Sequence, residues 1–261
     1  MWQARLAPPA AILAAWALAP AAACAQSLYV IPTDSHAPVL ASVQPLRVVL
    51  HARDPDRLAK RLGAGPPAAG TDSIGVVLDS TTSLRGLPDR SWLDATFVLD
   101  FHDSGVAKLS AAFEQSLGRK PAADEATRAA LVDFVAASLT PSSSRSFDIA
   151  SEIAVRREGD CTEFAVLTAT LARAAGIPAR VALGVALVAE AQRFGAYGHA
   201  WAELQIGGKW VVADAALAKV KRPVWYLPIG VLQDEGMGYA LDVAGLTPVW
   251  VQRIEVLGAV Q

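Results

Sequence analysis

The chain has 261 residues, of which 53% are hydrophobic and 18% are charged, and its formal net charge is -2. This composition is typical of a globular protein with a large core. Because the charge is nearly balanced and the basic clusters are short, the sequence has no electrostatic footprint for nucleic acid, and no nucleic-acid partner is expected.

The first 25 residues have the pattern of a secretory signal peptide. Arg5 supplies the charged start, residues 6–23 supply an apolar run, and the small residues at 23–25 supply a cleavage site before Gln26. The mature protein is therefore expected to begin at Gln26, to contain 236 residues (261 minus 25), and to be periplasmic or secreted.

Two other fates of this segment are less favoured. Lipid attachment at Cys24 would give an anchored lipoprotein, but a lipobox has a branched aliphatic residue three positions earlier, where this chain has Ala21. A transmembrane anchor is disfavoured because Pro8, Pro9 and Pro20 interrupt an already short apolar run. No integral membrane segment is expected after signal cleavage.

Residues 26–120 are interpreted as an N-terminal strand-rich region. Runs of β-branched and aromatic residues predict strands at 46–51, 74–78 and 95–101, and a helix is expected around 105–117. The histidines of this region lack the spacing of metal ligands, so they are interpreted as structural, and no metal or cofactor is expected. They are His36, His51 and His102.

The next region, 121–220, is helical at first and is interpreted as the core of the protein. Apolar residues that recur at i, i+3, i+4 and i+8 from Leu131 predict one helix, which ends before Pro141. A shorter helix is expected from about Asp148 and is stopped by Gly159. Residues 221–261 are interpreted as a C-terminal strand extension, with a strand in TPVWVQRIEVL.

A further helix begins in the stretch EGDCTEFAVLTATLARAAGIPAR, residues 158–180. Asp160 can cap this helix, Glu163 can complete a capping box, and Gly176 supplies a left-handed exit. Cys161 then lies in the first turn, where the helix dipole and unpaired N–H groups favour a thiolate and lower the pKa of a cysteine from about 8.5.

Cys161 becomes the single cysteine of the mature chain once Cys24 is removed with the signal. A disulfide framework and a thiolate metal cluster are therefore excluded. We interpret Cys161 as a nucleophile; the alternative is a buried cysteine that packs like a small hydrophobic residue. A redox role is disfavoured because the mature chain has no resolving cysteine.

The stretch YGHAWAELQIGGKWVVADAAL predicts a β-hairpin with a two-residue turn at Gly207-Gly208. Continued from that turn, the register makes His199 and Asp214 diagonal neighbours on one face, within reach of a side-chain hydrogen bond. Such a pair would supply a base and the group that orients it. The alternatives are a structural strand histidine and an aspartate that only ends the strand in an Asx turn.

Two more residues of the first strand share the face of His199. Trp201 is expected to pack beside the site rather than act in it, and Glu203 is expected to be exposed to solvent.

Four short phrases carry a resemblance to a known family. They are GDCTE at 159–163, AAGIPAR at 174–180, GHAWAE at 198–203 and WVVAD at 210–214. As a set they resemble the core of the bacterial transglutaminase-like superfamily, within the wider papain-like fold, over about residues 121–217. The resemblance implies an α+β fold in which the helix bearing the nucleophile packs on an antiparallel sheet.

Carried over to this chain, the resemblance implies Cys161 as nucleophile, His199 as general base and then acid, and Asp214 as the residue that holds the imidazole. The implied function is a secreted cysteine enzyme acting on amide or peptide bonds through a thioester: a protease, an amidase or an acyl transferase. Its substrate would be a protein or peptide, with the cell envelope as one source. Two residues depart from the family pattern: Phe164 stands in place of histidine and Ala215 in place of proline.

A second function remains open from the sequence. The same fold could serve as a non-catalytic binding or assembly module of the cell envelope. The intact set of cysteine, histidine and aspartate argues against that alternative, because a module without turnover has no need of all three.

Overall fold

The computed structural model describes residues 30–35, 40–79, 84–85, 87, 90–142, 148–239, 246 and 250–260. The expected signal peptide, with Arg5 and Cys24, lies outside the described residues, as does His36.

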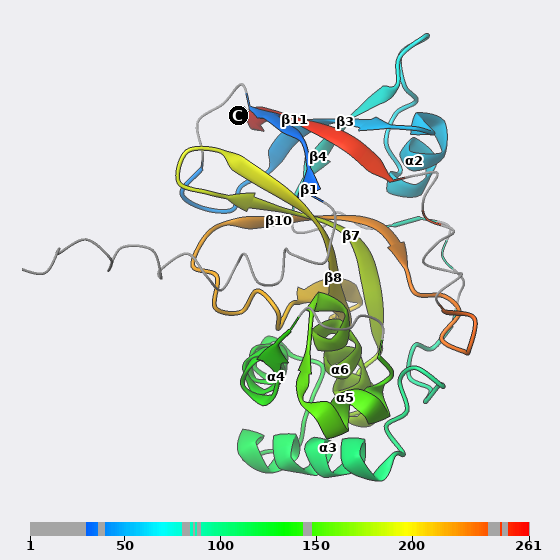
Figure 1. Cartoon of the computed structure of the whole chain (residues 1–261), viewed down its shortest axis with the longest axis vertical. Helices are drawn as coiled ribbons and strands as arrows, with labels where there is room; N and C mark the ends of the chain where they lie inside the picture. Colours follow the sequence, from blue (N-terminus) through cyan, green and yellow to red (C-terminus); the bar gives the residue numbers. More distant parts are fainter. Residues whose placement is uncertain are drawn as a thin grey trace, which may run out of the picture.

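A five-stranded antiparallel sheet forms the middle of the molecule, and we call it the central sheet (Figure 1). Its order is β1-β8-β7-β10, with β9 also paired to β8. The strands are β1 (Val30–Ile31), β7 (Ala179–Ala189), β8 (Phe194–Ile206), β9 (Lys209–Ala213) and β10 (Val224–Val231). Every residue of β7 is buried, which is the pattern of a strand covered on both faces of its sheet.

A second sheet, the outer sheet, packs on one end of the central sheet and has the order β2-β11-β3-β4. Its elements, with the helix beside them, are β2 (Thr33–Ser35), β3 (Leu46–Ala52), β4 (Ser73–Leu78), β11 (Val251–Ala259) and α2 (Pro55–Leu62). Strand β11 pairs antiparallel with β3 and parallel with β2, so the segments before and after the middle of the chain meet in one sheet. The strands predicted at 46–51 and 74–78 and in the C-terminal phrase are confirmed.

Helices cover the other end of the central sheet (Figure 1). They are α3 (Ser104–Leu117), α4 (Glu125–Ser138), α5 (Ala150–Arg156) and α6 (Cys161–Ala174). Helix α6 packs against β8 and β7 on one side and against the other three helices on the other, so it is buried from Cys161 to Arg173. The predicted helices and the α+β class, with a helix packed on an antiparallel sheet, are confirmed.

A short parallel pair of strands fixes the entrance to α6. Strand β5 (Thr140–Pro141) follows α4, and β6 (Glu158–Gly159) directly precedes α6. The end of one helix is thereby tied to the beginning of another. This strand pair fixes the backbone that leads into the first turn of α6.

The strand predicted at 95–101 is wrong. The backbone of Val98 makes no ladder: its N–H donates to the carbonyl of Glu235 at 3.0 Å, and its carbonyl accepts from the N–H of Ala150 at 2.9 Å. The carboxylate of Asp100 accepts a hydrogen bond from the backbone two residues on. Such local side-chain bonds compete with a strand ladder, so the segment forms turns although Val98 and Leu99 are buried.

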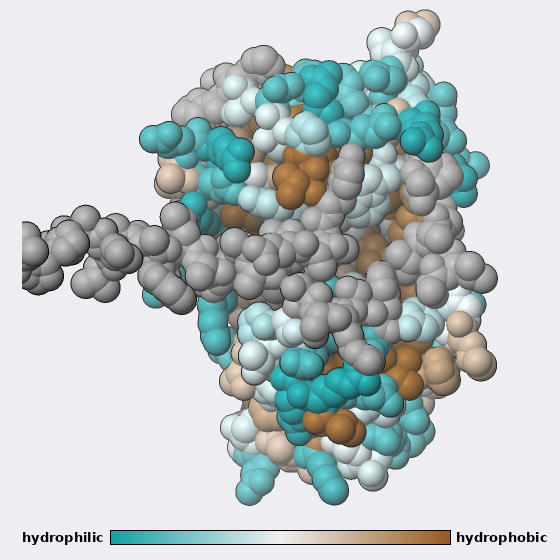
Figure 2. Space-filling model, in the orientation of Figure 1, coloured by the Kyte–Doolittle hydropathy of each residue, from teal (hydrophilic) through white to brown (hydrophobic). Residues whose placement is uncertain are grey.

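Hydrophilic residues dominate the outer sheet and the helical end on the face shown in Figure 2, where apolar residues form smaller patches. Within the described residues, no helix combines the length and apolar character that crossing a membrane requires.

Candidate active site

The predicted capping box at the start of α6 is present. Asp160 is the N-cap and accepts a hydrogen bond from the backbone N–H of Thr162 at 2.8 Å, while Glu163 accepts one from the backbone N–H of Asp160 at 2.8 Å. Cys161 is the first helical residue, as predicted, and is fully buried. The helix exit at Gly176 has a φ of 77°, in the left-handed region that favours glycine.

Glu163 has a second structural role besides the capping box. Its second carboxylate oxygen accepts a hydrogen bond from the backbone N–H of Asp148 at 2.9 Å, so it also fixes the segment before α5. Burial, and after it the negative charge of Asp160, raises the pKa of Glu163 to about 7. Near neutral pH this carboxyl group is therefore partly uncharged, which limits the negative charge beside Cys161.

The raised pKa of Glu163 predicts a pH-dependent stability. Between its unfolded value of 4.5 and the folded value of about 7, the folded protein binds more protons than the unfolded chain. The contribution of Glu163 to the free energy of unfolding therefore falls as the pH rises through this window and stays constant above it. We expect the difference between wild type and Glu163→Gln in free energy of unfolding to fall by about 3 kcal/mol from pH 4.5 to 7.5.

Urea titrations at a series of pH values measure this difference, and Glu125→Gln, which changes an exposed carboxylate, is the control. A wild-type and Glu163→Gln difference that stays constant or rises with pH would contradict the assignment.

The predicted hairpin has the predicted register. Strands β8 and β9 pair from Ile206 opposite Lys209 to Ala202 opposite Ala213, where β9 ends. Along the same strand β8, strand β1 pairs with Ala196 and Tyr197, so His199 lies between the two paired segments. Here Nε2 of His199 lies 2.8 Å from Oδ2 of Asp214, as the diagonal relation predicted.

The carboxylate of Asp214 has four hydrogen-bond donors. Oδ1 accepts from the backbone N–H groups of Ala216 and Leu217, at 3.0 and 3.2 Å, which is an Asx turn at the strand end. Oδ2 accepts from His199 and from the hydroxyl of Tyr226, at 2.8 and 2.9 Å. Asp214 therefore does both: Oδ1 accepts the hydrogen bonds of the Asx turn, and Oδ2 accepts the hydrogen bond from His199.

The partner of Nε2 sets the tautomer of His199. An ionised carboxylate can only accept, so Nε2 carries the hydrogen of this bond, and in the neutral imidazole the lone pair lies on Nδ1. Both side chains are almost fully buried, with exposed fractions of 4% for His199 and 5% for Asp214. Nδ1 of His199 is thus the basic atom, and the buried carboxylate of Asp214 holds the ring through Nε2.

Cys161 lies in the buried cluster that α6 forms with the central sheet. The cluster also contains Ala200, Ala213 and Ala215, the sequence neighbours of His199 and Asp214. The structure thus joins His199 to Asp214 directly and places Cys161 in the core cluster that contains their sequence neighbours.

Two aromatic rings cover the imidazole. The ring centroids of His199 and Trp201 are 6.1 Å apart at an interplanar angle of 22°, and those of Trp201 and Tyr226 are 5.1 Å apart. The expectation that Trp201 packs beside the site is confirmed. Tyr226 was not found from the sequence, because a tyrosine in an apolar strand such as VWYLPIGV is an ordinary β residue with no motif around it.

The expectation that Glu203 is exposed is wrong. Strand β7 places Arg180 directly opposite Glu203, and the two side chains form an ion pair with an N–O distance of 2.7 Å. The guanidinium of Arg180 also stacks on the ring of Trp210, 4.0 Å from its centroid. Both charged residues are buried, because a cross-strand partner compensates the loss of water.

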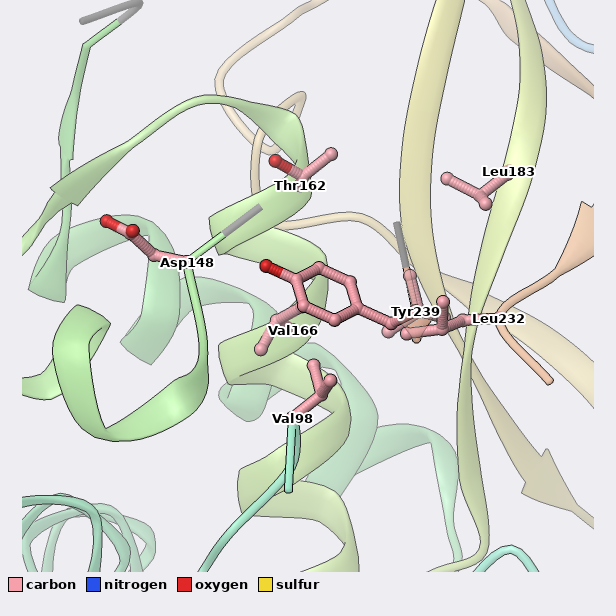
Figure 3. A pocket seen from close by; sticks show the side chains of 8 residues that line it. Val98, Asp148, Thr162, Val166, Leu183, Leu232 and Tyr239 are labelled. Carbon is pink, nitrogen blue, oxygen red and sulfur yellow. The ribbon is translucent and has the colours of Figure 1, made fainter. Parts of the chain in front are cut away.

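A small pocket lies between α6 and β7, beside the residue that follows Cys161 (Figure 3). Its cavity volume is about 10 Å³, roughly enough for one water molecule. The lining is mostly apolar, with the ring of Tyr239 reaching between the helix and the strand in Figure 3. The lining residues are Val98, Asp148, Thr162, Val166, Val181, Leu183, Leu232 and Tyr239.

Residues 111–215 match the profile of the transglutaminase-like superfamily. This segment is similar to the core of that superfamily. It contains α4, α5, α6 and the β8–β9 hairpin, with Cys161, His199 and Asp214 all inside it. The family resemblance seen in the sequence is thereby confirmed for this part of the chain.

Several solved structures are similar to the chain at low identity. A candidate cysteine protease from Cytophaga hutchinsonii has 18% identity and a TM-score of 0.42, over 73% of this chain and 77% of that one. The periplasmic domain of TgpA from Pseudomonas aeruginosa has 22% identity and a TM-score of 0.34, over 46% of each chain. A TGase has 22% identity and a TM-score of 0.33, over 43% of this chain and 31% of that one. No curated protein matches the sequence.

Proposed function

We propose that this protein is a secreted or periplasmic cysteine enzyme that acts on amide or peptide bonds through Cys161, His199 and Asp214. The observation that supports the proposal most is the 2.8 Å hydrogen bond between Nε2 of His199 and Asp214, which makes Nδ1 the basic nitrogen. The transglutaminase-like core around the three residues supports acyl transfer as the class of chemistry.

In the proposed reaction the thiol of Cys161 gives its proton to Nδ1 of His199, and the sulfur attacks the carbonyl carbon of the substrate. The backbone N–H of Cys161, at the start of α6, is the natural first donor to the oxyanion. The C–N bond then breaks, and the departing amine takes the proton from His199. The product of this half-reaction is a thioester on Cys161.

The second half-reaction releases the acyl group. His199 takes a proton from water, the resulting hydroxide oxygen attacks the thioester carbonyl, and the proton returns to the departing sulfur as the acid is released. A second amine in place of water would give transamidation. Hydrolysis is the proposed reaction because water is the acceptor that is always present.

Peptidyl chloromethyl ketones test the proposal without a known substrate, because they alkylate a nucleophilic thiol. We expect acetyl-leucyl chloromethyl ketone to modify Cys161 of the wild-type protein and to react markedly more slowly with His199→Ala, which lacks the proposed base. Mass spectrometry locates the adduct.

A failure of this reagent to modify Cys161, or equal rates in wild type and His199→Ala, would contradict the proposed function and favour a binding or assembly module that uses the same fold.

A further inference from the structure

We propose that Tyr226 is a positioning residue for the His199–Asp214 pair, whose hydroxyl holds Oδ2 of Asp214 and tempers the basicity of His199. Its place in catalysis rests on the proposed function, but its effect on the imidazole does not. The residue belongs to β10, a strand with no recognisable motif, and lies beyond the segment that matches the superfamily profile.

The geometry places two donors on one oxygen atom. The hydroxyl of Tyr226 lies 2.9 Å from Oδ2 of Asp214, and Nε2 of His199 lies 2.8 Å from the same atom. The tyrosine ring also packs against the imidazole, with centroids 6.4 Å apart, and against Trp201. Tyr226 therefore fixes both the acceptor atom and the plane of the ring that binds it.

The hydroxyl of Tyr226 stays a donor over the whole working range of pH. Burial, followed by the negative charge of Asp214, raises the pKa of Tyr226 well above its usual range. A neutral hydroxyl beside a carboxylate can only donate to it, so the hydrogen bond keeps one direction.

Few other charges act on the pair from the elements packed around it. From α4, the guanidinium of Arg128 interacts with Tyr226 and donates to the carbonyl of Val212 at 2.9 Å. From β7, the residue opposite His199 is Gly184, which carries no side chain. From the start of α6, the titratable groups are Cys161, Glu163 and the N-cap Asp160.

Sharing Oδ2 has a consequence for the protonated imidazole. A carboxylate that already receives a hydroxyl hydrogen presents less negative charge to a second donor, so Asp214 stabilises the imidazolium less than an unshared carboxylate would. Removing the hydroxyl should therefore favour the protonated ring. The variant Tyr226→Phe keeps the ring and loses only the hydroxyl. The effect of its hydrogen bond to Asp214 can therefore be measured without the loss of ring packing.

The test is a titration of the His199 ring by NMR in the full mature protein, with the resonance assigned by its loss in His199→Ala. We expect Tyr226→Phe to raise the midpoint by about one pH unit, a tenfold change in the protonation equilibrium. Tyr197→Phe is the matched control, because it removes another tyrosine hydroxyl that donates to a carboxylate, that of Glu190, away from the pair.

A Tyr226→Phe midpoint equal to or below that of wild type would overturn the assignment, as would an equal shift in Tyr197→Phe. The titration needs no reactive thiol, so its outcome is independent of the alkylation of Cys161. An inert thiol with the expected histidine shift would refute the proposed function and leave the role of Tyr226 toward the imidazole intact.

Discussion

Asp214→Asn is expected to lower the turnover of any amide that the wild-type protein cleaves by about 10³- to 10⁴-fold, the scale of a wrong histidine tautomer. The side chain of asparagine has one acceptor oxygen, whereas Asp214 accepts at both oxygens. If the asparagine oxygen keeps the Asx turn, its amide hydrogens face His199 and force the imidazole proton onto Nδ1. The general base is then lost while the fold remains.

The turnover number with saturating substrate is the measurement, alongside the melting temperature to show that the variant folds. Asp103→Asn is the matched control, because Asp103 caps α3 and asparagine also caps helices well. Retention of a tenth or more of the wild-type turnover by Asp214→Asn would contradict the role assigned to Asp214.

Glu235→Ala is expected to cost about 3 to 5 kcal/mol of folding free energy, the usual loss when one partner of a buried ion pair is removed. The two carboxylate oxygens of Glu235 accept from both terminal nitrogens of Arg173, at 2.7 and 2.8 Å. Both side chains are almost without exposure, at 2% and 0%. The variant would leave the guanidinium buried at the end of α6 without its counter-charge.

Urea unfolding measures the loss, with Arg193→Ala as control, since Arg193 forms an exposed pair with Glu190 and should change stability by about 1 kcal/mol or less. The double variant Arg173→Met with Glu235→Leu should recover part of the loss, because it removes the buried guanidinium of Arg173 together with its partner, while Arg90 still loses its ion pair with Glu235. A loss below about 1 kcal/mol in Glu235→Ala would show that the pair does not hold the end of α6 to the segment of Glu235.

The parts of the site that follow local rules were predictable from the sequence. The capping box at Asp160 and Glu163 follows from spacing alone, and so does the position of Cys161 at the helix start. The two-glycine turn fixed the hairpin register, and with it the meeting of His199 and Asp214, because strand pairing propagates residue by residue from a tight turn.

The contacts between residues that are distant in the sequence were not predictable in this way. Glu203 is buried because β7 places Arg180 opposite it, and no sequence pattern around Glu203 predicts this contact. The segment 95–101 is apolar and β-branched, yet its backbone partners are residues from distant parts of the chain. Tyr226 reaches Asp214 across the fold from β10, which only the packing of the sheet reveals.

The two departures from the family pattern have modest structural consequences. Phe164 is buried in the core under α6, where a histidine would need a hydrogen-bond partner. Ala215 lies inside the Asx turn of Asp214, which holds its shape through two backbone hydrogen bonds without the rigid ring of proline. Neither change removes a contact of the His199–Asp214 pair.

The central claim is that Cys161 is a thiolate nucleophile supported by His199, and the rate of alkylation by iodoacetamide against pH tests it most directly. The mature wild-type protein and His199→Ala should be compared from pH 4 to pH 10. The account predicts fast modification of wild-type Cys161 well below pH 8, and a marked loss of rate near neutrality in His199→Ala. A thiol that is inert, or that titrates near the ordinary cysteine value of about 8.5 in both proteins, would contradict it.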